Sequence, residues 1–132
     1  MQPRTRSVLT DALAACDYIR STIAGLSGSD YVCNEDVRSI VERKLITVGE
    51  ALIRVRQRDE EVFGSIADAR SAIALRNVIV HDYNDIDDGR VFLIVTELLP
   101  ILRKSIAAAL HDAVEGGGAG ESSEESSGPM PN

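Results

Sequence analysis

Residues 75–84 are LRNVIVHDYN and combine a helical spacing of apolar residues with polar groups suited to chemistry. At about 100° per residue, Asn77 and His81 lie one turn apart on the same face of a helix. Arg76 is long enough to bring its guanidinium towards the imidazole, and it shares a ridge with Tyr83 if the helix extends that far. The apolar residues point in the remaining directions, so we expect much of this helix to be covered by protein.

The same apolar spacing extends over almost the whole chain, and no segment alternates with period two for long enough to form a strand. The spacing predicts helices over residues 7–26, 34–56, 66–81 and 88–114. Asn34 is a suitable N-cap for the second of these helices. The fold class we expect is therefore an all-α bundle of four main helices.

Glycine, serine and proline mark the expected interruptions. Gly25, Gly28 and the Ser-Asp pair that follows supply stop and turn chemistry, and Gly64-Ser65 marks a short break. Pro100 removes one backbone donor, so we expect a kink in the last helix. Residues 116–132, GGGAGESSEESSGPMPN, have nothing to bury, so we expect a helical domain over 1–115 and a disordered tail over 116–132.

The charge of the chain limits its partners. The 132 residues carry 14 basic and 21 acidic side chains, and residues 111–132 hold five of the acids and no base. The other 110 residues therefore have a net charge of only −2. A dominant polybasic nucleic-acid binder is excluded, and any contact with nucleic acid must come from a local patch.

Several other classes of protein have no signal in this sequence. No apolar run is long enough to span a bilayer, and the start of the chain leads into no signal peptide. Cys16 and Cys33 lack metal spacing and are expected to be reduced. We therefore expect a cytoplasmic protein with no membrane contact, no metal site and no cofactor.

The polar groups of residues 75–84 suit phosphate chemistry. Arg76 presents a planar, permanently charged fork that matches phosphate oxygens, and His81 titrates near neutrality. Together they could cleave RNA without a metal ion, the imidazole transferring a proton and the guanidinium stabilising the crowded phosphorus. Spacing alone equally allows a helix-end histidine beside a salt-bridging arginine.

This stretch resembles the R-x-x-x-x-H-x-Y signature of HepT-like proteins in the HEPN superfamily. Residues 34–51, which end in VGEA, resemble the second helix of that family, and ELLPIL at 97–102 is also in the family style. The similarity covers residues 7–107.

The resemblance implies a dimeric helical bundle that brings two Arg/His motifs into one cleft. It further implies a toxin that acts as a metal-independent endoribonuclease and is paired with a nucleotidyltransferase antitoxin of the MNT type, which adds AMP to the motif tyrosine. Carried over to this chain, Arg76 and His81 would be catalytic, Asn77 would support them, and Tyr83 would be the AMPylated hydroxyl. Glu50 would hold Arg76 or His81 in place, or would serve a structural contact.

Two other interpretations stay open. The chain could be a non-catalytic HEPN module that binds a nucleotide through Arg76, or a scaffold for its nucleotidyltransferase partner. It could also be an interaction protein whose polar motif only specifies the homodimer. Arg54, Arg56 and Arg58 either extend an RNA-binding surface or are solvated helix-end charges.

Overall fold

A computed structural model of the chain describes residues 1–117, except for the side chains of Tyr83 and of residues 114–117. Over these residues the structure contains helices and no strand. The predicted all-α fold class is confirmed. The tail predicted over 116–132 lies outside the described residues except for Gly116 and Gly117, whose backbone belongs to the last helix.

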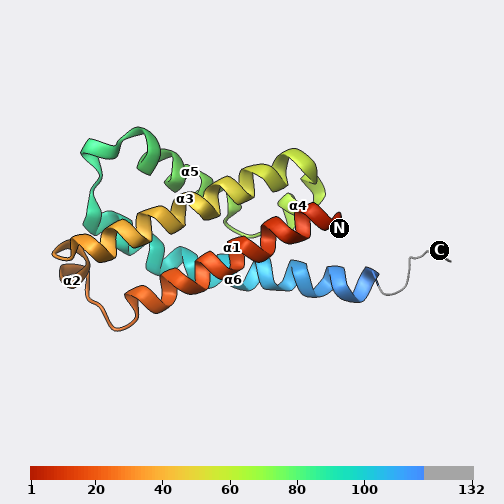
Figure 1. Cartoon of the computed structure of the whole chain (residues 1–132), viewed down its shortest axis with the longest axis horizontal. Helices are drawn as coiled ribbons and strands as arrows, with labels where there is room; N and C mark the ends of the chain where they lie inside the picture. Colours follow the sequence, from red (N-terminus) through yellow and green to blue (C-terminus); the bar gives the residue numbers. More distant parts are fainter. Residues whose placement is uncertain (118–132) are drawn as a thin grey trace.

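Four long helices form the body of the molecule: α1 (Pro3–Ile23), α3 (Glu35–Arg58), α5 (Ala69–His81) and α6 (Asp88–Gly117). They correspond to the four predicted helices. Along the chain α1, α3 and α5 alternate in direction, and α6 returns in the direction of α3 (Figure 1). The end of α5 and the start of α6 therefore lie at the same end of the molecule as α2 (Gly28–Val32) (Figure 1).

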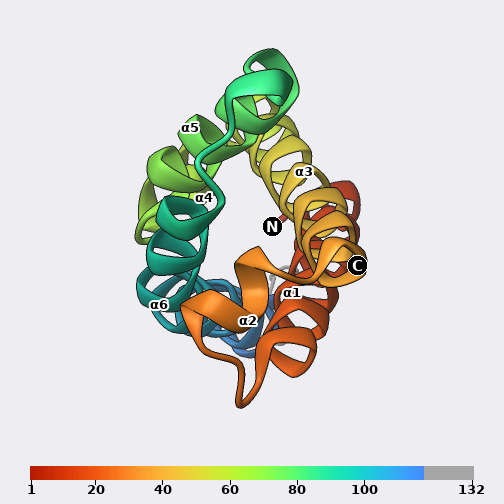
Figure 2. The same cartoon turned by 90° about the vertical axis from the view of Figure 1, so that its left-hand side faces the viewer.

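The helices are arranged around the axis of the molecule as Figure 2 shows. α3 packs against both α1 and α5, and α6 packs against α1 and α2. α5 has its main contact with α3 and touches α6 only slightly. This arrangement leaves one side of α5 without a covering helix.

Two short helices and one turn of 3-10 helix complete the fold: α2, α4 (Glu60–Ser65) and η1 (Tyr83–Asp85). The expected stop after the first helix is confirmed, since α1 ends at Ile23 and Gly25 has a φ of 78°, although Gly28 itself begins α2. The expected break falls at residues 66–68, directly after Gly64-Ser65, which end α4. A capping box between Ser27 and Asp30 starts α2. The Asp59 carboxylate accepts from the backbone N–H of Val62 at 3.2 Å and starts α4.

The predicted start of α3 is confirmed. The Asn34 side chain accepts from the backbone N–H of Val37 at 3.1 Å, and Glu35 and Asp36 lie in the first turn, where the helix dipole favours negative charge.

The core is aliphatic and lies between the inner faces of the long helices. Its fully buried side chains include Leu9, Ile19, Val41, Leu52, Val55, Val95, Leu99, Leu102 and Ile106. Ile40 of α3 is 37% exposed and lies at the margin of this core. α6 continues through Pro100, and the expected kink there stays a prediction.

Both cysteines are free, as expected. Burial raises the pKa of the Cys16 thiol to about 12, so this thiol stays protonated at neutral pH. No helix among the described residues is long and apolar enough to cross a membrane.

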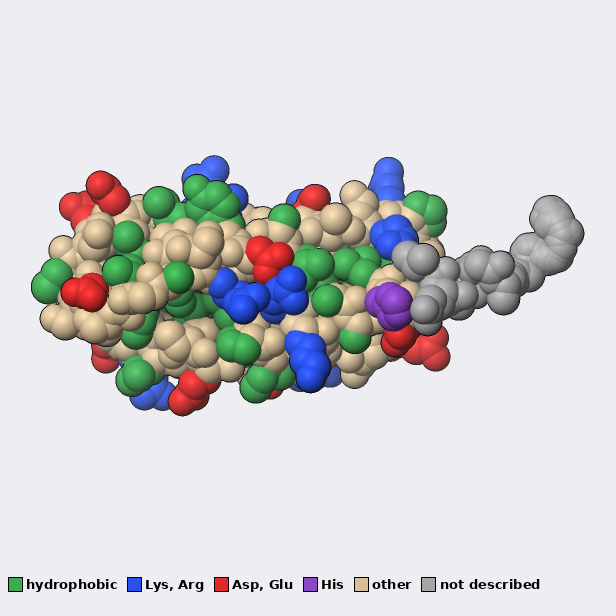
Figure 3. All heavy atoms as spheres, turned by 90° about the horizontal axis from the view of Figure 1, so that it is seen from below, with side chains coloured by type: hydrophobic (Ala, Val, Ile, Leu, Met, Phe, Trp, Pro, Cys, Tyr) green, Lys and Arg blue, Asp and Glu red, His purple; other side chains and the backbone are tan. Residues whose placement is uncertain are grey.

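The face on the α1 and α6 side mixes basic, acidic and apolar side chains (Figure 3). Asp17 of α1 pairs with Arg20 of its own helix and with Arg103 of α6.

Candidate active site

The motif occupies the second half of α5. Arg76 and Asn77 lie in the middle of the helix, and His81 is its last residue. The backbone N–H of Asp82 closes the helix by donating to the carbonyl of Val78 at 2.8 Å. Because α5 ends there, Tyr83 begins η1 and does not share a helical ridge with Arg76. The side chain of Tyr83 lies outside the described residues.

Gly49 allows α5 to lie directly on the backbone of α3. A β-carbon placed at Gly49 would lie 2.3 Å from Cβ and 2.6 Å from Cγ of Arg76. A side chain at position 49 would overlap the Arg76 stem, so only glycine lets that stem pack directly against the α3 backbone. The crossing of α3 and α5 thereby fixes the direction in which the guanidinium extends.

Two polar contacts hold the guanidinium of Arg76. Its Nη1 donates to Oδ1 of Asn77 at 2.9 Å, and its Nη2 pairs with Oε2 of Glu50 at 3.3 Å. Its Nε is buried and has no partner among the described side chains. The Arg76 side chain is 20% exposed, and each η nitrogen has a second N–H donor besides the one in these contacts.

Glu50 therefore forms its ion pair with Arg76 and not with His81, the other partner expected for it. A pocket of about 110 Å³ lies beside Glu50, and Thr47 and Arg54 of the same helix also line it.

His81 is exposed at the end of α5. Its imidazole makes no hydrogen bond or ion pair with any other described side chain, and Arg76 does not reach it. Asn77 is also exposed, in agreement with the predicted common face. The structure therefore brings Arg76, Asn77 and Glu50 together and leaves the imidazole open to solvent.

The flanks of this face are more open than the sequence predicts. Leu75 and Ile79 are buried, but Val78 is 42% and Val80 is 40% exposed. On a helix the two valines lie on either side of the Asn77 and His81 face. The expectation that protein covers much of this helix holds for Leu75 and Ile79 but not for Val78 and Val80.

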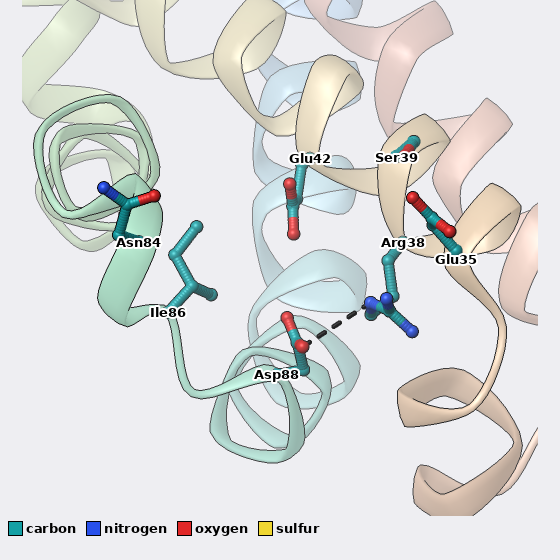
Figure 4. A pocket seen from close by; sticks show the side chains of 7 residues that line it. All are labelled: Glu35, Arg38, Ser39, Glu42, Asn84, Ile86 and Asp88. Carbon is teal, nitrogen blue, oxygen red and sulfur yellow. Dashed lines mark ion pairs between the residues drawn. The ribbon is translucent and has the colours of Figure 1, made fainter.

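A polar pocket of about 360 Å³ follows the motif, between the start of α3, the segment after α5 and the first turn of α6 (Figure 4). Arg38 pairs with Asp88 across it at 3.5 Å, and Glu42 and Ile86 point into it (Figure 4). Asn84, three residues after His81, also lines it. Sequence reasoning missed this pocket because its residues come from distant parts of the chain.

The pocket is acidic in character. Burial raises the pKa of the Glu42 carboxyl, the nearby charge of Asp88 raises it further, and Arg38 opposes both. The hydroxyl of Tyr31 beneath is fully buried without a hydrogen-bond partner among the described residues. Its pKa is also raised, chiefly by burial and then by Glu42 and Asp88.

The arrangement defines a class: a helical protein whose arginine and histidine, five residues apart, are presented on an open face of one helix. An arginine fork and an exposed imidazole are the groups that phosphate-ester chemistry uses without a covalent intermediate. Across the side chains described within residues 1–113, no three His, Cys, Asp or Glu gather in a way that could hold a metal ion.

The family model described as ribonuclease HepT-like matches residues 12–109, so this chain belongs to the HepT-like ribonuclease family of the HEPN superfamily. It is 25% identical over 101 residues to a Methanocaldococcus jannaschii protein named "Putative RNase MJ1380", covering 76% of this chain and 92% of that protein. No solved structure matches the chain.

Proposed function

We propose that this protein is the toxin of a HEPN/MNT pair and cleaves RNA as a metal-independent, homodimeric endoribonuclease. The observation that carries the proposal is the seating of Arg76: its stem lies on Gly49, its guanidinium is oriented by Asn77 and Glu50, and His81 remains open on the same helix. The family to which the chain belongs supports the reaction class.

The reaction is an internal transesterification. The ribose 2′ oxygen attacks the adjacent phosphorus while one imidazole accepts its proton, and the bond to the 5′ oxygen breaks as an imidazolium protonates that oxygen. The products are a 2′,3′-cyclic phosphate and a 5′-hydroxyl. Arg76 stabilises the charge that accumulates on the phosphoryl oxygens in the transition state. A homodimer supplies two copies of His81, one for each proton transfer.

The exposed valines support the dimer. Val78 and Val80 are two-fifths exposed beside an imidazole that has no described partner, a surface better suited to an interface than to water. Burying them against a second copy would also exclude water from the reacting groups.

RNA cleavage in excess EDTA tests the enzyme. The wild type should cleave a mixed-sequence RNA and leave cyclic phosphate ends, while His81→Ala and Arg76→Ala should lose about 10²-fold or more in rate. His111→Ala removes the other histidine and is the matched control, which should cleave like the wild type.

Equal cleavage by all four proteins would identify a contaminant and defeat the proposal. RNA or nucleotide binding that depends on Arg76 without any cleavage would establish the alternative, a non-catalytic binding module. Cleavage abolished by EDTA would overturn metal independence.

Silencing by AMPylation has a separate test. We propose that the Tyr83 hydroxyl attacks the α-phosphorus of ATP in the partner's active site, with pyrophosphate as the leaving group. The added phosphate would bring negative charge and bulk two residues from His81. Incubation with ATP and the nucleotidyltransferase should add one AMP to the intact mass. Tyr83→Phe should prevent this addition, and Tyr18→Phe, at an exposed tyrosine of α1, should not.

A further inference from the structure

Two guanidinium groups share one aromatic ring at the end of the α3–α5 pair opposite the polar pocket. The guanidinium carbon of Arg56 lies 5.6 Å from the ring centroid of Phe63, and that of Arg70 lies 5.4 Å from it. The two positive charges are therefore at most about 11 Å apart. Both arginines are exposed, and Phe63 is 4% exposed.

These two charges have no local acidic partner. Neither arginine forms an ion pair with a described carboxylate, although Glu60, Glu61 and Asp68 are close in sequence. Arg70 is the second residue of α5, whose first turn holds no acid. A cation at the positive end of a helix is electrostatically unfavourable, so the position of Arg70 destabilises the helix. A bound anion would offset this repulsion.

Arg70 is aligned with the reactive residues of the same helix. It precedes Asn77 by seven residues and His81 by eleven, and at 100° per residue all three lie within about 40° of one another. All three are exposed. At 1.5 Å per residue, Arg70 lies about 16 Å from His81 along the helix, a distance spanned by a few nucleotides.

The facing side of α3 changes charge along its length. Glu42, Gly49 and Arg56 are seven residues apart and share one face of that helix. Glu42 lines the acidic pocket, Gly49 contacts Arg76, and Arg56 meets Phe63. A polyanion that reaches the motif is therefore repelled at one end of the α3–α5 pair and attracted at the other.

We propose that Arg56 and Arg70 bind the phosphate backbone of the RNA strand on one side of the scissile linkage and so position it along α5 towards His81. This inference rests on the proposed ribonuclease function. The interaction is with phosphates, because guanidinium forks match phosphate oxygens and the buried Phe63 leaves no ring face for a base. The site is accordingly indifferent to base sequence.

RNA binding measured without cleavage tests this site. In a His81→Ala background, fluorescence anisotropy with a labelled single-stranded RNA is followed from low to high salt. Arg56→Gln with Arg70→Gln should weaken binding at low salt about tenfold or more. The slope of log affinity against log salt should become shallower by about 0.7 for each phosphate that the protein no longer neutralises. Arg56→Lys with Arg70→Lys keeps the charges and should recover most of the salt dependence.

The matched control is Arg20→Gln with Arg90→Gln, which removes the same charge at the other end of the molecule. Equal binding by the two double variants would overturn the proposal, and thermal melting establishes that each is folded. If the glutamine variant does not fold, Arg70→Lys alone decides, because replacing the fork weakens bidentate phosphate binding while the charge remains.

Cleavage assays separate this inference from the proposed function. With His81 restored, the glutamine variant should raise KM more than it lowers kcat, and the effect should be larger for a long strand than for a dinucleotide. Weakened RNA binding in the glutamine variant, with no cleavage by any protein, would leave the phosphate site in place and defeat the ribonuclease. Wild-type cleavage with unchanged binding in the glutamine variant would defeat only the phosphate site.

Discussion

Gly49 leaves no room for a side chain, because the stem of Arg76 occupies the space beside it. In Gly49→Ala the new methyl group would overlap the stem of Arg76. We expect the free energy of unfolding to fall by about 1–3 kcal/mol, as for other overpacked sites, and RNA cleavage to fall with it because the guanidinium is displaced. Urea unfolding and the EDTA cleavage assay measure the two effects.

Gly64→Ala is the matched control. Gly64 lies in α4 with nothing within 4 Å of the position a β-carbon would take. Alanine there should raise stability by about 0.4–1 kcal/mol, by restricting the unfolded chain. Equal effects at the two glycines would contradict the close crossing of α3 and α5.

Glu42 gives stability a pH dependence of predictable sign. Its pKa is raised in the folded chain above the ordinary value of 4.5, so its contribution to stability is greatest below pH 4.5 and is lost as pH rises through the folded pKa. Glu42→Gln should therefore be more stable than the wild type at pH 7, and the difference should shrink towards pH 4.5. Denaturation at both pH values measures this.

Glu97→Gln on the exposed side of α6 is the control for that experiment. A stabilisation by Glu42→Gln that is the same at both pH values would show that packing of the amide, and not titration of the carboxyl, is responsible.

Sequence reasoning located part of the candidate site. The common face of Asn77 and His81 follows from local spacing, which helix geometry converts directly into position. The role of Glu50 came from the resemblance to the family, because Glu50 lies 26 residues from Arg76 on another helix. The seat provided by Gly49 and the polar pocket depend on how α3 crosses α5 and meets α6. No local pattern encodes those distances.

At the scale of elements, Pro100 weakens α6. It lies inside the helix and cannot donate to the carbonyl of Thr96. Pro100 is exposed, so Pro100→Ala should restore that hydrogen bond without a cavity and raise the free energy of unfolding by about 1–3 kcal/mol. Pro3→Ala, at the first position of α1 where proline is well tolerated, should bring no gain. Chemical denaturation compares the two variants, and a less stable Pro100→Ala would show that α6 needs the irregularity.

The long helices were predictable and the short ones were not. An amphipathic stripe of thirteen or more residues is a strong signal, and Asn34 marked the start of α3 to within one residue. α2 and α4 have five and six residues and bury one residue each, Tyr31 and Phe63, so they show no periodicity. Their caps, Ser27 with Asp30 and Asp59, were the only local signs of them.

The side of α5 that no helix covers is the surface through which we expect two copies of the chain to form a dimer. If the exposed valines form the interface, Val78→Glu should convert a dimer into a monomer, since it would place a carboxylate in the interface. Leu93→Glu makes a similar change at a side chain of α6 that is 63% exposed, and it should remain dimeric. Light scattering distinguishes the masses. A monomeric wild type, or a monomer only in Leu93→Glu, would rule out the α5 interface.

The start of α1 lies against the end of α6, where Nη2 of Arg6 donates to the carbonyl of Leu110 at 3.4 Å. The order of the helices along the chain is therefore one of several that the same bundle could accept. A circular permutant that joins residue 112 to Pro3 through a short linker, and opens the chain at the exposed Ala67, would begin with the motif helix. Such a protein would present α5 at a free amino end, where a fluorophore or tether could be attached beside the Arg56 and Arg70 site.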